Sequence, residues 1–265
     1  MSIGRHTGLV GAPRVTGPDA MVEAVLETGI VPFFENSIRG YSIEEMTPPQ
    51  FWFDGDELGP WDWKIACVQS GEIAYGKFLW GGKASFATVE FYRELMNYRR
   101  SLPKYEPDDS GRRILDYVDA NGSITIREVR GLLGVKKSAA DAAVARLENQ
   151  TRLVIGDILR VYRGPDLHYN GWQTASFCRP DDLFGGGGPG GPGGIGSGGP
   201  GPIGPDGISP VGPIGPARFR GFPFEDDSDP LETSRTPSES LEYLKAHVRR
   251  LFPHATERDL AKLFG

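Results

Sequence analysis

The sequence is poor in the residues from which disulfide frameworks and metal sites are built. Its 265 residues contain only two cysteines, Cys67 and Cys178, without a C-x-x-C pair, and four histidines without metal-ligand spacing. This argues against a disulfide scaffold and a zinc site, and a reducing cytoplasm is the expected location. The chain also lacks a Gly-x-x-x-x-Gly-Lys-Ser/Thr loop, a dinucleotide fingerprint and a serine nucleophile elbow, so we expect neither a metal nor an organic cofactor.

Long apolar runs and an overall positive charge are missing as well. No segment approaches the roughly 20 apolar residues of a membrane span, and the first residues, MSIGRHTGLVGAPRV, lack the apolar run of a signal peptide. The formal net charge is −6, so a surface for nucleic acid has to be a local patch. With 38% hydrophobic and 24% charged residues, the composition is that of a packed globular protein.

Glycine and proline, in contrast, are concentrated in one run. Residues 185–216 read GGGGPGGPGGIGSGGPGPIGPDGISPVGPIGP, but the Gly-x-y period that a collagen triple helix requires breaks repeatedly. This composition, followed by an acidic stretch, predicts a flexible linker over 185–235. Beyond it, Thr236 and Thr256 are placed to cap two short helices. Because this helix pair over 236–265 cannot bury its apolar stripes alone, we expect it to dock back on the main body.

Residues 111–184 have the most recognisable order of elements. Three segments carry apolar residues at helical spacing (GRRILDYVDANG, IREVRGLLG and KKSAADAAVARLENQ), and SIT after the first reads as a short strand. RLVIGD and ILRVYRG then alternate like two strands joined at Gly156-Asp157. Helix, strand, helix, helix and hairpin is the order of a winged helix. The sequence therefore predicts an α+β protein with a winged-helix domain over 111–184.

Charge within this segment favours a nucleic-acid partner. Residues 111–164 hold ten basic and six acidic side chains. Lys136 and Lys137 open the third helix, which in helix-turn-helix folds meets the major groove, while Arg160 and Arg163 lie on or after the wing, within reach of phosphates. The alanine-rich middle of that helix offers few groups to read base edges, so we expect contact with the backbone. The alternative is a winged helix that binds another protein.

The N-terminal part, 19–110, reads as a small α/β unit with a Trp-rich β-hairpin. Residues 63–68 and 73–80 alternate like strands around Ser70-Gly71, and SFATVEFYRELMNYRRS follows as a helix. On a strand, Trp61 and Trp63 would share one face, either as core or as a base-stacking pocket. The basic residues that could steer phosphate near such a pocket, or simply be solvated, are Lys64, Lys77, Lys83, Arg99 and Arg100.

Several stretches together resemble a family of small bacterial proteins described as AlkZ-related. They are VPFFENSIRGYSIEEMTPPQFWF, GPWDWK, YGKFLWGGKASF, NYRR and LFPHATERDLAKLFG, and the resemblance covers about 21–184 and 236–265. These proteins are distant relatives of winged-helix DNA glycosylases that excise alkylated and crosslinked bases. The resemblance implies a DNA-associated protein with a role in DNA repair.

The resemblance also bears on catalysis. The glycosylases carry a Gln-x-Gln or Gln-x-Asp motif, and no glutamine of this chain is followed two residues later by Gln or Asp. We therefore expect a protein that binds DNA through the phosphate backbone without that motif. The alternative is an active monofunctional glycosylase in which a substituted carboxylate, Asp62 or Glu45, orients the water beside aromatic residues that stack on an extruded base. Glu44 and Asp54 are further candidates for that carboxylate.

Overall fold

The computed structural model describes residues 14–53, 59–185 and 229–265. The helices are α1 (Pro18–Thr28), α2 (Ile43–Met46), α3 (Gln50–Phe53), α4 (Pro60–Gln69), α5 (Val89–Arg100), the 3-10 turn η1 (Pro103–Tyr105), α6 (Asp109–Asn121), α7 (Ile126–Leu133), α8 (Lys137–Asn149), α9 (Pro180–Phe184), α10 (Pro237–Leu251) and α11 (Glu257–Phe264). The strands are β1 (Ile30–Pro32), β2 (Ile73–Leu79), β3 (Lys83–Thr88), β4 (Ile124–Thr125), β5 (Val154–Arg163) and β6 (His168–Cys178). The fold is therefore α+β, as the sequence predicted, and both sheets are small and antiparallel.

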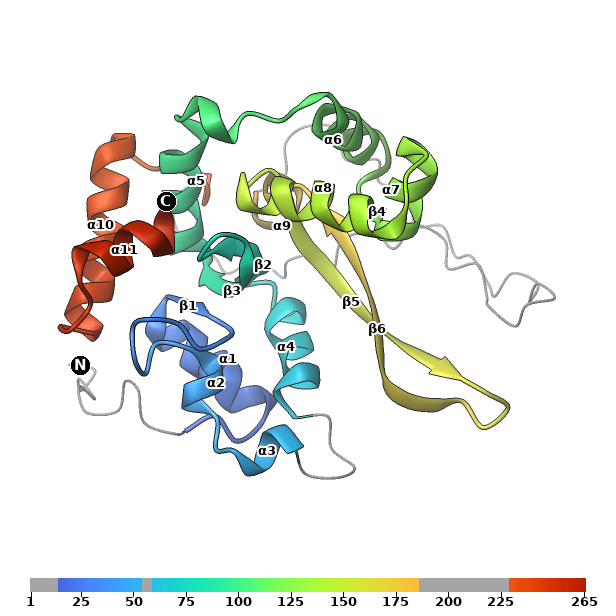
Figure 1. Cartoon of the computed structure of the whole chain (residues 1–265), viewed down its shortest axis with the longest axis horizontal. Coiled ribbons are helices and arrows are strands. Elements are labelled where there is room, and N and C mark those ends of the chain that lie inside the picture. Colours follow the sequence, from blue (N-terminus) through green and yellow to red (C-terminus); the bar gives the residue numbers. More distant parts are fainter. Residues whose placement is uncertain (1–13, 54–58, 186–228) are drawn as a thin grey trace.

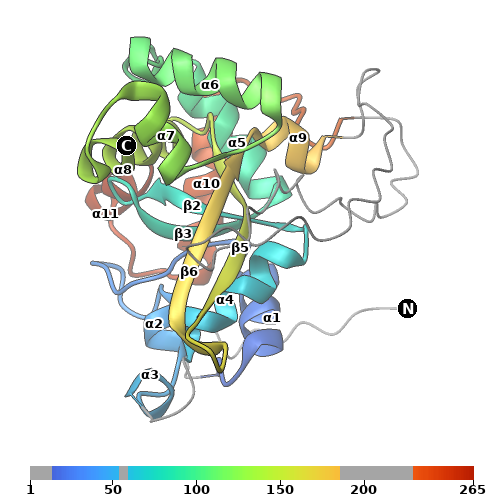
Figure 2. The same cartoon turned by 90° about the vertical axis from the view of Figure 1, so that its right-hand side faces the viewer.

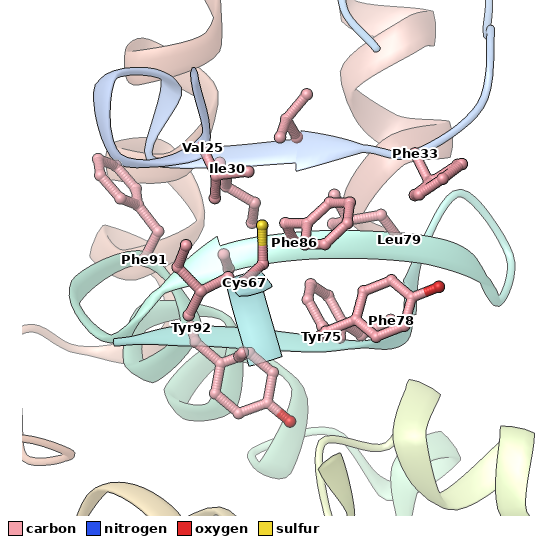
Figure 3. Close-up of a cluster of buried hydrophobic side chains, with 14 of the residues drawn as sticks. Val25, Ile30, Phe33, Cys67, Tyr75, Phe78, Leu79, Phe86, Phe91 and Tyr92 are labelled. Atoms are coloured by element: carbon pink, nitrogen blue, oxygen red, sulfur yellow. The ribbon is translucent and has the colours of Figure 1, made fainter. Parts of the chain in front are cut away.

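The first sheet, in the order β1-β3-β2, forms the centre of the N-terminal part. Most residues of its strands are apolar, and these side chains pack between α1, α4 and α5. Figure 3 shows Tyr75, Phe78 and Phe86 of the sheet gathered with Phe33 and Tyr92 in this core. Burial of these large rings supplies the main driving force for folding of the unit.

The second sheet, in the order β4-β6-β5, belongs to a unit that begins with α6. Its element order is helix, strand, helix, helix and two paired strands, and it has its own hydrophobic cluster between Ile114 and Phe177. Figures 1 and 2 show the long β5–β6 hairpin leaving α6, α7 and α8 and running along α4. Residues 154–158 and 178–184 also contribute to the first core, so the two units share a packed boundary.

Helix α4 corrects the predicted Trp-rich hairpin, because residues 60–69 are helical where a strand over 63–68 was expected. Pro60 at the first helical position and Asp62 in the first turn both favour a helix start. The helix packs against α1, β2 and β5, so apolar residues surround much of its circumference and no helical period is visible in the sequence. The observed hairpin is β2–β3, with Trp80 at its turn.

Two further boundaries differ from the sequence prediction. Residues 85–88 extend β3 before Thr88 starts α5, although the whole stretch was predicted as helix. Gly156 does not form a turn either, because β5 continues through it with a β-bulge and the chain reverses only after Arg163. A Cβ atom on Gly156 would lie 2.7 Å from Cys178 Sγ, which explains the glycine.

The two C-terminal helices pack against the N-terminal part. Leu244 and Val248 of α10 and Leu260 and Phe264 of α11 are buried in the first core, and α10 lies along α5 (Figure 1). Thr236 and Thr256 each form a capping box, as the sequence predicted. The predicted linker falls mostly on 186–228, which lies outside the described residues. Across the three described ranges, no helix has the length and apolarity that crossing a membrane requires.

Candidate nucleic-acid interface

Helix α4 meets the β5–β6 hairpin through a network of polar side chains centred on Asp62. The Arg160 guanidinium donates to both carboxylate oxygens of Asp62, at 3.1 and 2.6 Å. The Tyr169 hydroxyl donates to Asp62 at 2.7 Å, and the Gln173 amide nitrogen lies 3.4 Å from the same oxygen. Paired residues of an antiparallel ribbon point to one face, so the register Arg160↔Gln173 brings both side chains to α4.

The charged partners keep Asp62 ionised. Partial burial raises the pKa of Asp62, but hydrogen bonds from Arg160 and Tyr169 outweigh that effect and hold it below its usual value. Two-pronged contact with an arginine is the strongest common form of carboxylate pairing. Both oxygens of Asp62 therefore already accept hydrogen bonds in this conformation. Arg160 is paired within the protein and is not free to bind phosphate.

Lys64 lies beside this network and is buried, although it was predicted to face solvent with Lys77 on a neighbouring strand. Its ammonium donates to the Trp61 carbonyl at 2.5 Å and to Gln173 Oε1 at 2.6 Å. It also lies 4.2 Å from the centroid of the Trp61 ring. Burial lowers the pKa of Lys64 to about 8, in spite of nearby Asp62.

The two tryptophans of α4 point in different directions, since residues two apart on a helix do not share a face. Trp63 is 8% exposed and packs edge-on against Phe51, so it belongs to the core. Trp61 is 48% exposed and contacts Phe33 and Phe34. Only Trp61 of this pair could stack on a ligand.

The other predicted carboxylates that the structure describes, Glu44 and Glu45, form hydrogen bonds with residues that do not contact Asp62 in its hydrogen-bond network. Glu45 lies in α2, which Ser42 caps, and accepts hydrogen bonds from the Gly40 N–H and the Ser42 hydroxyl, both at 2.7 Å. Glu44 accepts from the Glu35 N–H at 2.7 Å. Both carboxylates therefore organise local backbone, while Asp54 lies outside the described residues.

Arg99 and Arg100 were predicted to reach phosphate, and the structure corrects this for Arg99. Its side chain is fully buried and donates to the carbonyls of Asn149 and Phe264. Arg100 is partly buried, donates to the Thr151 carbonyl at 2.6 Å and lies 3.8 Å from Asp181. The basic end of α5 thus joins α8 and α11 to the first core. Lys77 and Lys83, at the turn end of the β2–β3 hairpin, are exposed.

Five exposed basic residues lie on α6, on α7 and at the start of α8, and we call them the basic patch. Its members are exposed basic residues of three consecutive helices, none of which pairs with a carboxylate among the described residues: Arg113, Arg127, Arg130, Lys136 and Lys137. Arg113 reaches across to the Leu132 carbonyl at 2.7 Å, which ties α6 to the end of α7. Other arginines of this unit, such as Arg112, Arg146 and Arg152, are each paired with an acidic residue.

The far part of the hairpin carries residues that the sequence interpretation missed. Tyr162 is 53% and Trp172 is 55% exposed, and the guanidinium of Arg163 lies 4.7 Å from the Trp172 ring centroid. The missed signal was the alternating pattern of HYNGWQT. It lies in β6, whereas the two strands predicted around Gly156-Asp157 together form the single strand β5. No group of three or more histidine, cysteine or acidic side chains in the described parts of the chain is arranged to hold a metal.

Comparison with known proteins identifies a family. A family described as AlkZ related matches residues 15–188, about two thirds of the chain. No curated protein and no solved structure gives a significant match.

Proposed function

Because the chain belongs to the AlkZ-related family, we propose that it is a DNA-associated protein that binds the phosphate backbone through a winged-helix domain over 111–184. The element order from α6 to β6, with β4 paired to β6, supports this assignment. In such a domain α8 is the recognition helix and the β5–β6 hairpin is the wing. The other proposed parts are an N-terminal unit over 19–110, a linker over 185–235 and the helix pair over 236–265.

The basic patch carries the proposal. Five exposed cations without an acidic partner in the described chain lie on the consecutive helices α6 and α7 and at the start of α8, whereas the whole chain has a net charge of −6. Cations concentrated in this way attract phosphates and release their counterions. Ala139 and Ala142 are exposed on α8 and cannot read base edges, so contacts to the backbone fit this surface better than sequence recognition.

Binding of a fluorescent duplex across a salt series tests the proposal. We expect the wild-type affinity to fall steeply with salt, and Lys136→Gln with Lys137→Gln to reduce the slope of log K against log salt by about two. The matched control is Arg112→Gln with Arg152→Gln, which removes the same charge from residues already paired with Asp109 and Glu106. Equal slopes for patch and control variants would contradict backbone binding through the patch. Absence of duplex binding at low salt would favour a winged helix that binds protein.

One observation supports a second candidate function, hydrolysis of the N-glycosidic bond of an alkylated base. Asp62 and Gln173 are 111 positions apart in the sequence, yet their carboxylate and amide lie side by side next to exposed Trp61. An ionised Asp62 could orient water while Trp61 stacks on the base. Arg160 would first have to release one carboxylate oxygen.

Base release from an alkylated duplex tests this second function. An active enzyme should lose base release in Asp62→Asn and keep it in Asp109→Asn, an exposed aspartate paired with Arg112 on α6. If wild-type protein binds the duplex and releases no base, the chain is a binding protein only.

A further inference from the structure

Exposed apolar side chains are concentrated on the far half of the β5–β6 hairpin. In the described chain, the large exposed hydrophobic residues are Leu26, Trp61, Tyr162, Leu167 and Trp172, and three of these five lie within 162–172. We call Tyr162, Arg163, Leu167, Tyr169 and Trp172 the aromatic tip. Scattered exposed apolar residues are ordinary, but a group on one protruding ribbon marks an interaction surface.

The backbone at the tip holds an apolar residue where a turn would favour glycine. Leu167 has φ of 48° and is 69% exposed. A branched side chain in the left-handed region costs free energy, and here that cost is not offset by burial. Leu167 therefore presents an apolar side chain to solvent at the end of the hairpin.

Cations accompany the rings of the tip. The Arg163 guanidinium lies over the Trp172 ring, and that of Arg160 lies 5.7 Å from the Tyr169 ring centroid. Arg160 is neutralised by Asp62, whereas Arg163 has no carboxylate partner in the described chain. Asp166 is the only acidic residue between 158 and 178. The tip thus offers flat rings and a single unneutralised guanidinium.

The rings of the tip lie on both faces of the ribbon. Side chains alternate along a strand, so Trp172 faces away from Gln173, whose amide is held against α4 by Lys64. Tyr162 and Tyr169 are paired across the hairpin, with ring centroids 5.5 Å apart. A flat ligand can reach the Trp172 ring on the face turned away from α4.

We infer that the aromatic tip binds unpaired nucleobases, which stack on Trp172 and Tyr162 while Arg163 holds the adjoining phosphate. Aromatic rings and an arginine plane suit bases that have lost their stacking neighbours, because every base offers such a face. Paired duplex bases expose only their edges, and one free arginine would contribute little to duplex backbone binding. This site goes beyond the proposed duplex contact, which rests on the basic patch.

Fluorescence anisotropy with a labelled oligodeoxythymidine and a labelled duplex of equal length tests the inference on the full chain. We expect Trp172→Ala with Tyr162→Ala to weaken single-strand binding about 5- to 100-fold and to leave duplex binding unchanged. Trp172→Phe should retain most of the single-strand affinity, since the ring remains. Leu26→Ala is the control, because it removes another large exposed apolar side chain, 43% exposed, from α1.

The outcomes separate this site from the proposed duplex function. Loss of single-strand binding in the tip variant, with normal duplex binding, supports the inference, whatever the basic-patch variant does. Single-strand affinity that is the same in the tip variant and the Leu26→Ala control would overturn it. So would a wild-type protein that does not bind oligodeoxythymidine at low salt. A patch variant with normal duplex binding contradicts the proposed function alone.

Discussion

Arg99 is a cation that the fold keeps entirely inside the protein. Its guanidinium donates to the Asn149 carbonyl at 2.7 Å and to the Phe264 carbonyl at 3.2 Å, and Tyr105 lies against it. These carbonyls are the C-terminal ends of α8 and α11, and Arg99 itself is in the last turn of α5. No acidic partner is present in the described chain, so the negative ends of three helices compensate the charge.

This environment could not be predicted from the sequence. NYRR at the end of an amphipathic helix has the pattern of a solvated basic helix end, which occurs far more often than a buried arginine. What buries Arg99 is the approach of α8 and α11 from 50 and 165 positions further along the chain. Asp62 was identified from its aromatic neighbours, but its partners Tyr169 and Gln173 lie on β6, a strand that the sequence analysis did not predict.

Glu148 is a buried carboxyl on α8 that faces β2. It is 2% exposed, and the Lys77 N–H donates to it at 3.3 Å. Burial raises the pKa of Glu148 from 4.5 to about 7, with Lys77 opposing the shift. The folded state therefore binds more protons than the unfolded state between these values, so this group makes the free energy of unfolding fall as pH rises from about 4.5 to 7.

Substitution Glu148→Gln should remove this dependence. We expect the variant to be more stable than wild type at pH 8, by up to about 3 kcal/mol, and to lose that advantage at pH 5, where the native carboxyl is already neutral. Urea denaturation at the two pH values measures the difference. Glu23→Gln, an exposed glutamate on α1, serves as control. A Glu148→Gln variant destabilised equally at both pH values would contradict the assigned burial of a titrating group.

At the scale of elements, hydrogen bonds from Arg160 and Tyr169 to Asp62 link the β5–β6 hairpin to α4. Asp62→Asn removes the charge that Arg160 and Tyr169 share, so we expect faster amide hydrogen exchange over residues 160–173. The midpoint of thermal unfolding should change little, because the ion pair is partly exposed. Hydrogen exchange followed by mass spectrometry makes the comparison, with Asp109→Asn as control. Unchanged exchange over 160–173 would mean that other contacts hold the hairpin.

Elements with a clear local signal were predicted well, and those defined by their neighbours were not. The helices α6 to α8 and the caps at Thr236 and Thr256 follow from residues within each segment. Helix α4 has no such signal, because α1, β2 and β5 bury several of its sides. Strand β1 has only three residues and exists through pairing with β3.

At the scale of the whole molecule, Glu94 joins the C-terminal segment to the body. This fully buried carboxylate of α5 accepts hydrogen bonds from Thr233 at 2.9 Å, Arg235 at 2.8 Å and Ser240 at 2.6 Å. All three donors precede or begin α10, where the chain returns to the described structure. The same region contributes Leu244 and Val248 to the first core.

Because the C-terminal helices complete that core, loss of the Glu94 contacts should weaken the entire N-terminal unit and not only the tail. We expect Glu94→Gln to lower the free energy of unfolding by about 2–4 kcal/mol, since buried Ser240 and the partly exposed Thr233 and Arg235 lose a charged, fully buried acceptor. Denaturation should remain a single transition when followed by tryptophan fluorescence, which reports on the body, and by circular dichroism. Glu90→Gln changes an exposed carboxylate of α5 that accepts from Tyr243 of α10, and it should cost far less. Early, separate melting of helical signal in Glu94→Gln would show instead that α10 and α11 fold independently of the body.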